Sequence, residues 1–187
     1  MHQHFIMHKP FGYLCQFVCE LPKKKLVGEL YAFPEGTMAI GRLDEKSEGL
    51  LLLTTDGNVS EAVRSKKVEK EYYAQVDGLI SEEAIASMTQ GVEIGIFDVK
   101  YITLPCKAFR LEKTPAFPLR SKKIRDDRHG PTSWVSVTLT EGKFRQVRKM
   151  CAAVGYPVLR LIRVRVGKIH LGDLKSGEVL KLEQLNY

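Results

Sequence analysis

The residues best suited to chemistry lie in one short segment, Gly41-Arg42-Leu43-Asp44 followed by Ser47-Glu48-Gly49. Arg42 and Asp44 are two residues apart, so in an extended chain both side chains point to one face and Leu43 to the other. A nearby guanidinium keeps a carboxylate ionised, as a nucleophile or base requires near neutral pH. Judged by residue types alone, an ordinary surface turn explains the segment at least as well.

A second segment, Glu141 to Met150, is basic and amphipathic. In a helix, Arg145, Arg148 and Lys149 share one side, because they are three and four residues apart. Apolar residues recur at helical spacing on the other side, at Phe144, Val147, Met150, Cys151 and Val154. Basic side chains at a helix start would also bring backbone donors near phosphate. A basic surface helix without a ligand is the competing interpretation.

Charge is concentrated in the second half of the chain. The formal net charge is +7, and such an excess favours a polyanionic partner. Residues 143–168 contain no acidic side chain but hold Lys143, Arg145, Arg148, Lys149, Arg160, Arg163, Arg165 and Lys168. A concentrated positive field is what a phosphate backbone requires, so nucleic acid is the favoured partner. A solvated basic face without a partner is the alternative.

Other features narrow the class of protein. The four cysteines, Cys15, Cys19, Cys106 and Cys151, form no CxxC pair and no zinc ligand set, so no metal site is expected. No apolar run approaches the length of a membrane span. The first residues do not resemble a signal peptide, so we expect a cytoplasmic location without membrane association.

The elements that must position these residues follow from hydrophobic periodicity and turn signals. The expected strands are Phe5–His8, Met38–Leu43, Leu50–Thr54, Glu71–Val76, Tyr101–Leu111, Trp134–Leu139, Val158–Val166, Ile169–Leu171 and Val179–Leu182. The expected helices are Leu26–Tyr31, Val59–Ser65, Ser81–Gln90 and residues 144–154. Strands with interspersed helices predict an α+β fold with a mixed or mostly antiparallel sheet. The basic strand over 158–166 should put one face in the core and the other toward an anion. The long segment 114–132 is expected to be a functional loop.

The motifs and their order resemble the pseudouridine synthases of the RsuA type. That family shows KPxG, then GRLD with a following GLLLLT-x-DG, then K-x-Y, then EG-K/R-x-RQ-V-R-x-M and a basic strand ending in Gly. The corresponding residues here are Lys9–Gly12, Gly41–Gly57, Lys70–Tyr72 and Glu141–Met150, running on to Gly167. Pro131-Thr132-Ser133-Trp134 resembles the branch called ribosomal large-subunit pseudouridine synthase E.

This resemblance implies a fold of two ferredoxin-like lobes that share a mixed, mostly antiparallel sheet with a central catalytic cleft. One catalytic domain would span 1–187 without a separate N-terminal RNA-binding domain. The implied reaction isomerises a uridine of 23S (large-subunit) ribosomal RNA to pseudouridine without cofactor or metal. The partner would be that RNA or a pre-ribosomal particle, and the protein a monomer.

The resemblance also assigns roles to residues. Asp44 would be the nucleophile or a base toward a glycal intermediate, Arg148 would pair with it, and Tyr72 would lie against the target base. The RNA-binding residues would be Arg42, Lys143, Arg145, Lys149, Leu161 and Arg163, with Arg42 beside the flipped nucleotide and Leu161 beneath the base. Two alternatives remain, a non-catalytic RNA-binding protein on the same fold and a nuclease with a metal at Asp44, Glu45 and Glu48.

Overall fold

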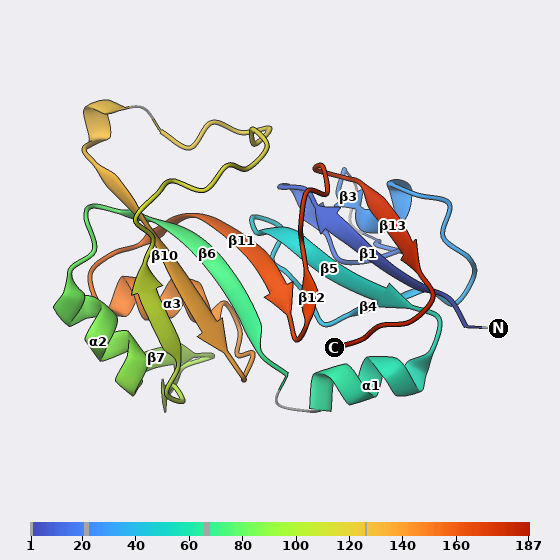
Figure 1. Ribbon diagram of the computed structural model, residues 1–187, viewed down its shortest axis with the longest axis horizontal. Coiled ribbons are helices and arrows are strands. Elements are labelled where there is room, and N and C mark those ends of the chain that lie inside the picture. Colours follow the sequence, from blue (N-terminus) through green and yellow to red (C-terminus); the bar gives the residue numbers. More distant parts are fainter. Residues whose placement is uncertain (1, 21–22, 66–67, 126) are drawn as a thin grey trace. The chain divides into compact units, whose positions relative to one another are not determined.

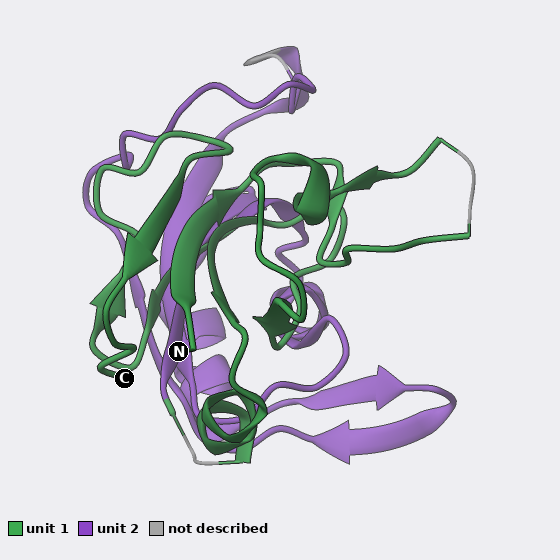
Figure 2. Cartoon of the chain, turned by 90° about the vertical axis from the view of Figure 1, so that its right-hand side faces the viewer, with its two compact units in different colours: residues 1–68, 162–187 green, residues 69–161 purple. Residues whose placement is uncertain are grey.

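The computed structural model describes residues 2–20, 23–65, 68–125 and 127–187 (Figure 1). The chain forms two compact units, coloured separately in Figure 2. Unit 1 comprises Met1–Val68 and Ile162–Tyr187, and unit 2 comprises Glu69–Leu161. The α+β fold with a mixed, mostly antiparallel sheet, predicted from the sequence, is confirmed.

Unit 1 is built around strand β5 (Glu48–Thr54), which is buried along its whole length. Its strand order is β13-β1-β5-β11, in which β1 (His4–Lys9) runs antiparallel to β5 and to β13 (Val179–Leu182). Strand β11 (Val158–Val166) enters the unit at Ile162 and runs parallel to β5. Burial on both faces explains why β5 reads as a continuous leucine run rather than an alternating pattern.

Shorter elements complete unit 1. Strand β4 (Met38–Ile40) pairs with β5, and β12 (Ile169–His170) pairs with β11. Strands β2 (Tyr13–Leu14) and β3 (Lys25–Leu26) form a separate parallel pair, followed by a 3₁₀ helix over Val27–Glu29. Helix α1 (Gly57–Ser65) begins where Asp56 Oδ1 accepts a hydrogen bond from the Asn58 amide at 2.9 Å.

Unit 2 contains the strands β6 (Lys70–Asp77), β10 (Thr132–Leu139) and β9 (Lys107–Arg110), in that order and antiparallel. Helix α2 (Glu82–Gln90) starts at the predicted cap, where Ser81 Oγ accepts from the Ala84 amide at 3.2 Å. Helix α3 is Gln146–Ala153, a 3₁₀ turn covers Asp127–His129, and β7 (Glu93–Ile96) pairs with β8 (Val99–Ile102) as a hairpin.

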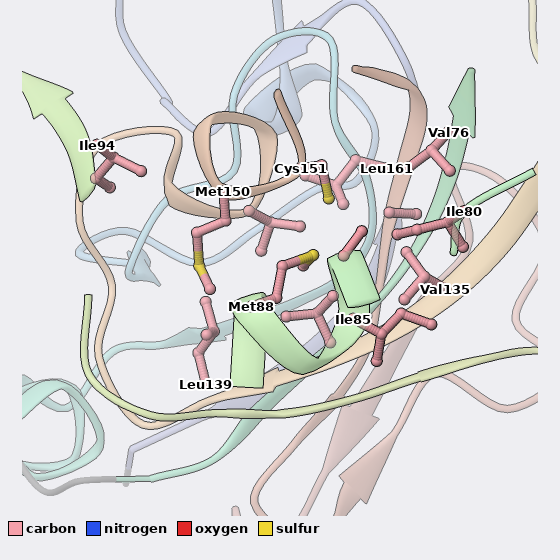
Figure 3. Packing of buried hydrophobic residues seen from close by; sticks show 14 residues of the cluster. Val76, Ile80, Ile85, Met88, Ile94, Val135, Leu139, Met150, Cys151 and Leu161 are labelled. Atoms are coloured by element: carbon pink, nitrogen blue, oxygen red, sulfur yellow. The ribbon is translucent and has the colours of Figure 1, made fainter. Parts of the chain in front are cut away.

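The core of unit 2 lies between its strands and the two helices (Figure 3). Ile85 and Met88 of α2, Met150 of α3 and Val135 of β10 belong to one buried cluster. Met88 and Met150 are completely buried. Both helices therefore cover the same face of the sheet, and α3 packs on it through Val147, Met150 and Cys151.

Four expectations about local structure were wrong. In unit 1, the helix predicted for Leu26–Tyr31 is only a 3₁₀ turn over Val27–Glu29, and the strand predicted for Met38–Leu43 ends at Ile40 because Gly41 takes a positive φ.

The other two expectations concern unit 2. The single strand predicted for Tyr101–Leu111 is divided at residues 103–106, where Pro105 cannot donate to a ladder, into β8 and β9. The helix predicted from Phe144 begins only at Gln146, after Arg145 in a left-handed conformation with φ 53°. Phe144 is consequently 50% exposed instead of part of the apolar face of the helix.

Candidate active site

Asp44 lies in the segment that joins β4 to β5. Strand β4 ends at Ile40 because Gly41 adopts a positive φ of 70°. Arg42 is exposed, Leu43 is buried and Asp44 is half-buried, which is the alternation predicted from the sequence. The Ser47 amide donates to the Asp44 carbonyl at 2.9 Å, so a tight turn follows the carboxylate directly.

Lys9 anchors this turn through hydrogen bonds to its backbone. Its Nζ donates to the carbonyl oxygens of Ser47 at 2.6 Å, Pro10 at 2.9 Å and Glu45 at 3.4 Å. The Gly12 amide donates to the same Glu45 carbonyl at 2.8 Å. The Lys9-to-Gly12 motif therefore fixes the backbone that carries Asp44. The sequence signal for this role was a lysine close after the apolar residues Phe5, Ile6 and Met7 of the same strand.

The ammonium group of Lys9 is fully buried, with no exposed surface. Burial lowers the pKa of Lys9 from 10.5 to about 8, although the neighbouring Glu48 and Asp44 carboxylates oppose the shift. The folded protein thus gives up this proton at a lower pH than the unfolded chain does.

Replacing Lys9 with Met should make the free energy of unfolding less sensitive to pH between about 8 and 10.5. Over this range the unfolded wild-type chain binds more protons than the folded one, so wild-type stability rises with pH relative to the variant. The rise should reach up to about 3 kcal/mol. Urea denaturation of both proteins across the range measures it, with the exposed Lys181→Met as control. A constant wild-type-to-variant difference would contradict the lowered pKa.

Cys15 supports the same segment through the backbone of Leu43. The Leu43 amide donates to Cys15 Sγ at 3.3 Å, and the thiol donates to the Leu43 carbonyl at 3.4 Å. Burial raises the pKa of the Cys15 thiol, so it stays protonated and can donate. The residue before Asp44 is thus held at both its polar backbone groups.

Arg148 and Tyr72, the other two candidate catalytic residues, belong to unit 2. Arg148 is half-buried on α3, and its Nη1 donates to the Val158 carbonyl at 3.4 Å. Tyr72 lies opposite Val137 in the β6–β10 ladder and packs against the edge of the core. Leu161, predicted to lie beneath the target base, is 5% exposed and part of the same core cluster.

The basic side chains predicted to bind RNA around α3 lie on its approach and first turn. Lys143 is exposed, with Nζ 4.6 Å from the centroid of the Tyr101 ring. Lys149 is half-buried, and its Nζ donates to the Gly95 carbonyl. Arg145 is exposed but precedes the helix, so the shared helical side predicted for Arg145, Arg148 and Lys149 is wrong.

The arginines of β11 are bound to main-chain carbonyls. Arg163 is 4% exposed, and its Nε donates to Leu50 O at 2.7 Å. Arg160 donates to Pro118 O and Arg165 to Gly167 O, each at 2.8 Å. These contacts organise the chain, so the prediction of a strand face directed at an anion does not fit, and neither does a direct RNA contact by Arg163.

The loop over 114–132 is anchored to unit 2 on the sheet face opposite the helices. Phe117 packs against Trp134 with ring centroids 5.8 Å apart, and Arg125 pairs with Asp77 at 2.6 Å. Arg125 is therefore a structural residue. Lys122 and Lys123 are exposed near the middle of the loop and are its candidates for contact with a ligand.

The candidate residues divide between the two units. Asp44, Arg42 and Arg163 belong to unit 1, and the remaining six to unit 2. The pairing of Asp44 with Arg148 joins residues of different units and stays a prediction. Among the described residues, no group of three or more His, Cys, Asp or Glu side chains is arranged to hold a metal ion. No helix in the same residues has the length and hydropathy of a membrane span.

Comparison with known proteins is consistent with the motif pattern. A family model described as RNA pseudouridylate synthase matches residues 3–153. The chain belongs to this family. It is accordingly an isomerase. Proteins named ribosomal large subunit pseudouridine synthase E are similar along most of its length. The one from Vibrio parahaemolyticus is 37% identical over 92% of this chain and 71% of its own, and the one from Xanthomonas campestris is 37% identical over 92% and 91%.

Solved structures support the same family. A crystal structure of a pseudouridylate synthase superposes with a TM-score of 0.76 at 28% identity, covering 97% of this chain and 70% of the other. The archaeal box H/ACA Nop10-Cbf5 complex matches with a TM-score of 0.57 at 19% identity over 94% of this chain and 51% of the other, which shows a likeness of fold alone.

Proposed function

We propose that this enzyme isomerises a specific uridine of 23S ribosomal RNA to pseudouridine, with Asp44 as the nucleophile. The assignment of the substrate is supported by the 37% identity, over 92% of the chain, to relatives named for the large ribosomal subunit. Support for Asp44 comes from its place in the Arg42-Leu43-Asp44 segment, on a turn fixed by Lys9. It would act as a monomer on this RNA or on a pre-ribosomal particle.

The proposed chemistry exchanges one glycosidic bond for another. The bond from the ribose C1′ to N1 of uracil breaks, the base turns, and C1′ bonds to C5. N1 gains a proton and C5 loses one, so no atom is added and no electron is transferred. The Asp44 carboxylate would either attack C1′ or act as a base toward a glycal intermediate. Arg148 would keep it ionised, and Tyr72 would face the base and receive the C5 proton.

The target nucleotide must leave its base stack to reach a carboxylate, at a cost of roughly a few kcal/mol. Contacts from Lys143, Arg145 and Lys149 to phosphates would offset this cost. Arg42, exposed beside Asp44, would contact the flipped nucleotide. The exposed lysines of the 114–132 loop would contribute to the choice of substrate.

The purified protein should form pseudouridine in transcribed 23S RNA at one or a few positions. Carbodiimide mapping by primer extension locates the product, with transcribed 16S RNA as the matched control. Ribosomal RNA from a strain lacking the protein should lose the same modification. Pseudouridine in the 16S RNA alone would refute the assignment of 23S RNA as the substrate. No pseudouridine in either RNA would favour a non-catalytic RNA-binding role.

A further inference from the structure

Two exposed aromatic rings are stacked on the surface of unit 2. Phe97, at the tip of the β7–β8 hairpin, is 76% exposed, and Phe144, just before α3, is 50% exposed. Their centroids are 5.1 Å apart and their planes are inclined by 25°. Each ring buries only part of its apolar surface in this contact, so the pair leaves an aromatic face in contact with water.

The hairpin holds Phe97 in an unfavourable backbone conformation. Phe97 and Asp98 have φ values of 46° and 65°, as a two-residue turn with positive φ at both positions requires. Such turns favour Asn-Gly, and a bulky residue at positive φ costs on the order of 1 kcal/mol or more. The chain accepts this strain at a position where Phe97 adds little to the core, which points to a role for the exposed ring.

A network of hydrogen bonds fixes the segment that carries Phe144. The Glu141 carboxylate accepts from the Tyr101 hydroxyl at 2.6 Å and from the Leu104 amide at 2.9 Å. It also accepts from the Gln146 side-chain amide, whose own oxygen accepts from the Lys143 amide at 2.9 Å. The loop before α3 is thereby tied to the chain that leaves the hairpin, so the two rings are held together in advance of any ligand.

Cationic groups accompany the rings. Lys149 Nζ lies 5.1 Å from the centroid of Phe144, Lys143 lies over Tyr101, and Arg145 is exposed beside Phe144 in sequence. Aromatic faces next to lysines and arginines are the composition of sites that bind single-stranded nucleic acid, where bases stack and phosphates meet the cations. A protein–protein interface instead favours few lysines and needs about 800 Å² from each partner.

We propose that Phe97 and Phe144 form a stacking platform for an unpaired base of the RNA substrate, outside the nucleotide that reacts. Lys143, Arg145 and Lys149 contact the phosphates next to that base. The inference rests on the proposed function for the identity of the RNA, but the binding it describes does not depend on isomerisation. It explains why Phe144, at helical spacing with the core residues, faces solvent.

Binding of a short fluorescent oligouridylate, measured by anisotropy, tests the platform. Phe97→Ala and Phe144→Ala should each raise the dissociation constant about tenfold, since stacking of one base on one aromatic ring has about this effect. Phe97→Trp should restore wild-type affinity, whereas Phe97→Leu, which is apolar but not aromatic, should not. The control is Ile102→Ala, a truncation of another hairpin side chain that is 70% exposed; it should bind like the wild type.

Three results would overturn the platform. They are unchanged affinity in both alanine variants, an equal loss in Ile102→Ala, and a concentration-dependent dimer in light scattering that Phe97→Ala dissolves, which would assign the rings to a second copy of the chain. A protein that forms no pseudouridine yet loses oligouridylate affinity in Phe97→Ala would refute the proposed function and keep the platform. Pseudouridine formation by the wild type, together with unchanged oligouridylate affinity in the variants, would refute the platform and keep the proposed function.

Discussion

Asp44→Asn is expected to abolish pseudouridine formation while leaving RNA binding intact. Asparagine matches aspartate in size but carries no charge, and it neither attacks C1′ nor acts as a base. Loss of an attacking group of this kind lowers the rate by at least about 10⁴-fold. Because Asp44 is half-buried and its backbone is held through Ser47, the exchange should leave the turn in place.

Two measurements separate chemistry from binding in this experiment. Pseudouridine in 23S RNA is quantified after a single turnover, and the dissociation constant for the same RNA is taken from filter binding. Asp173→Asn makes the same chemical change at an exposed position of unit 1 and should behave as wild type in both. Residual activity of Asp44→Asn within tenfold of wild type would remove the nucleophile assignment. A parallel loss of binding would indicate a structural role instead.

The motif around Asp44 could be predicted because local rules and global fold agree there. The alternation of Arg42, Leu43 and Asp44 requires only an extended chain, and the leucine run of β5 requires only a strand buried on both faces. The cap at Ser81 likewise depends on neighbours within one turn. Such features depend on only a few consecutive residues, so they can be predicted from the sequence.

The hairpin and the start of α3 could not be predicted for the opposite reason. Phe97-Asp98 is an unfavourable sequence for a two-residue turn, so the amino-acid sequence contains no signal for a hairpin there. Phe144 fits the helical period, but the bonds from Glu141 and Gln146 hold its loop outside the helix. Contacts that join residues 101, 104 and 141 are long-range and leave no periodic trace.

Buried basic residues are the other limit of sequence reasoning. Arg163 was predicted to bind RNA, yet it is buried and donates to a main-chain carbonyl, as the buried Lys9 also does. A basic residue in the sequence identifies a hydrogen-bond donor but not its acceptor. Here the acceptors include the Ser47 carbonyl for Lys9 and the Leu50 carbonyl for Arg163, both far away in the sequence. Part of the basic composition of this enzyme therefore serves its own architecture.

Gly49→Ala is expected to destabilise the protein more than any single change in the loops. Gly49 lies in β5 between Lys9 of β1 and Arg163 of β11, with a φ of 105°. A Cβ atom there would lie 2.3 Å from the Arg163 carbonyl oxygen and 2.7 Å from its amide nitrogen. Backbone atoms on a paired strand do not move aside as a flexible side chain does. We therefore expect a loss of at least about 3 kcal/mol in the free energy of unfolding.

The matched control is Gly57→Ala, eight positions further along in the first turn of α1. A Cβ at Gly57 meets nothing within 4 Å, and alanine favours a helix, so this variant should be neutral or more stable by up to about 1 kcal/mol. Urea unfolding of the three proteins measures both effects. If Gly49→Ala unfolds within about 1 kcal/mol of wild type, strands β5 and β11 do not approach as closely as this register requires. Gly49 pairs with Lys9 on one side and with Arg163 on the other. A tolerated alanine would therefore also indicate that the backbone at Lys9 is less tightly fixed than its hydrogen bonds to the turn after Asp44 require.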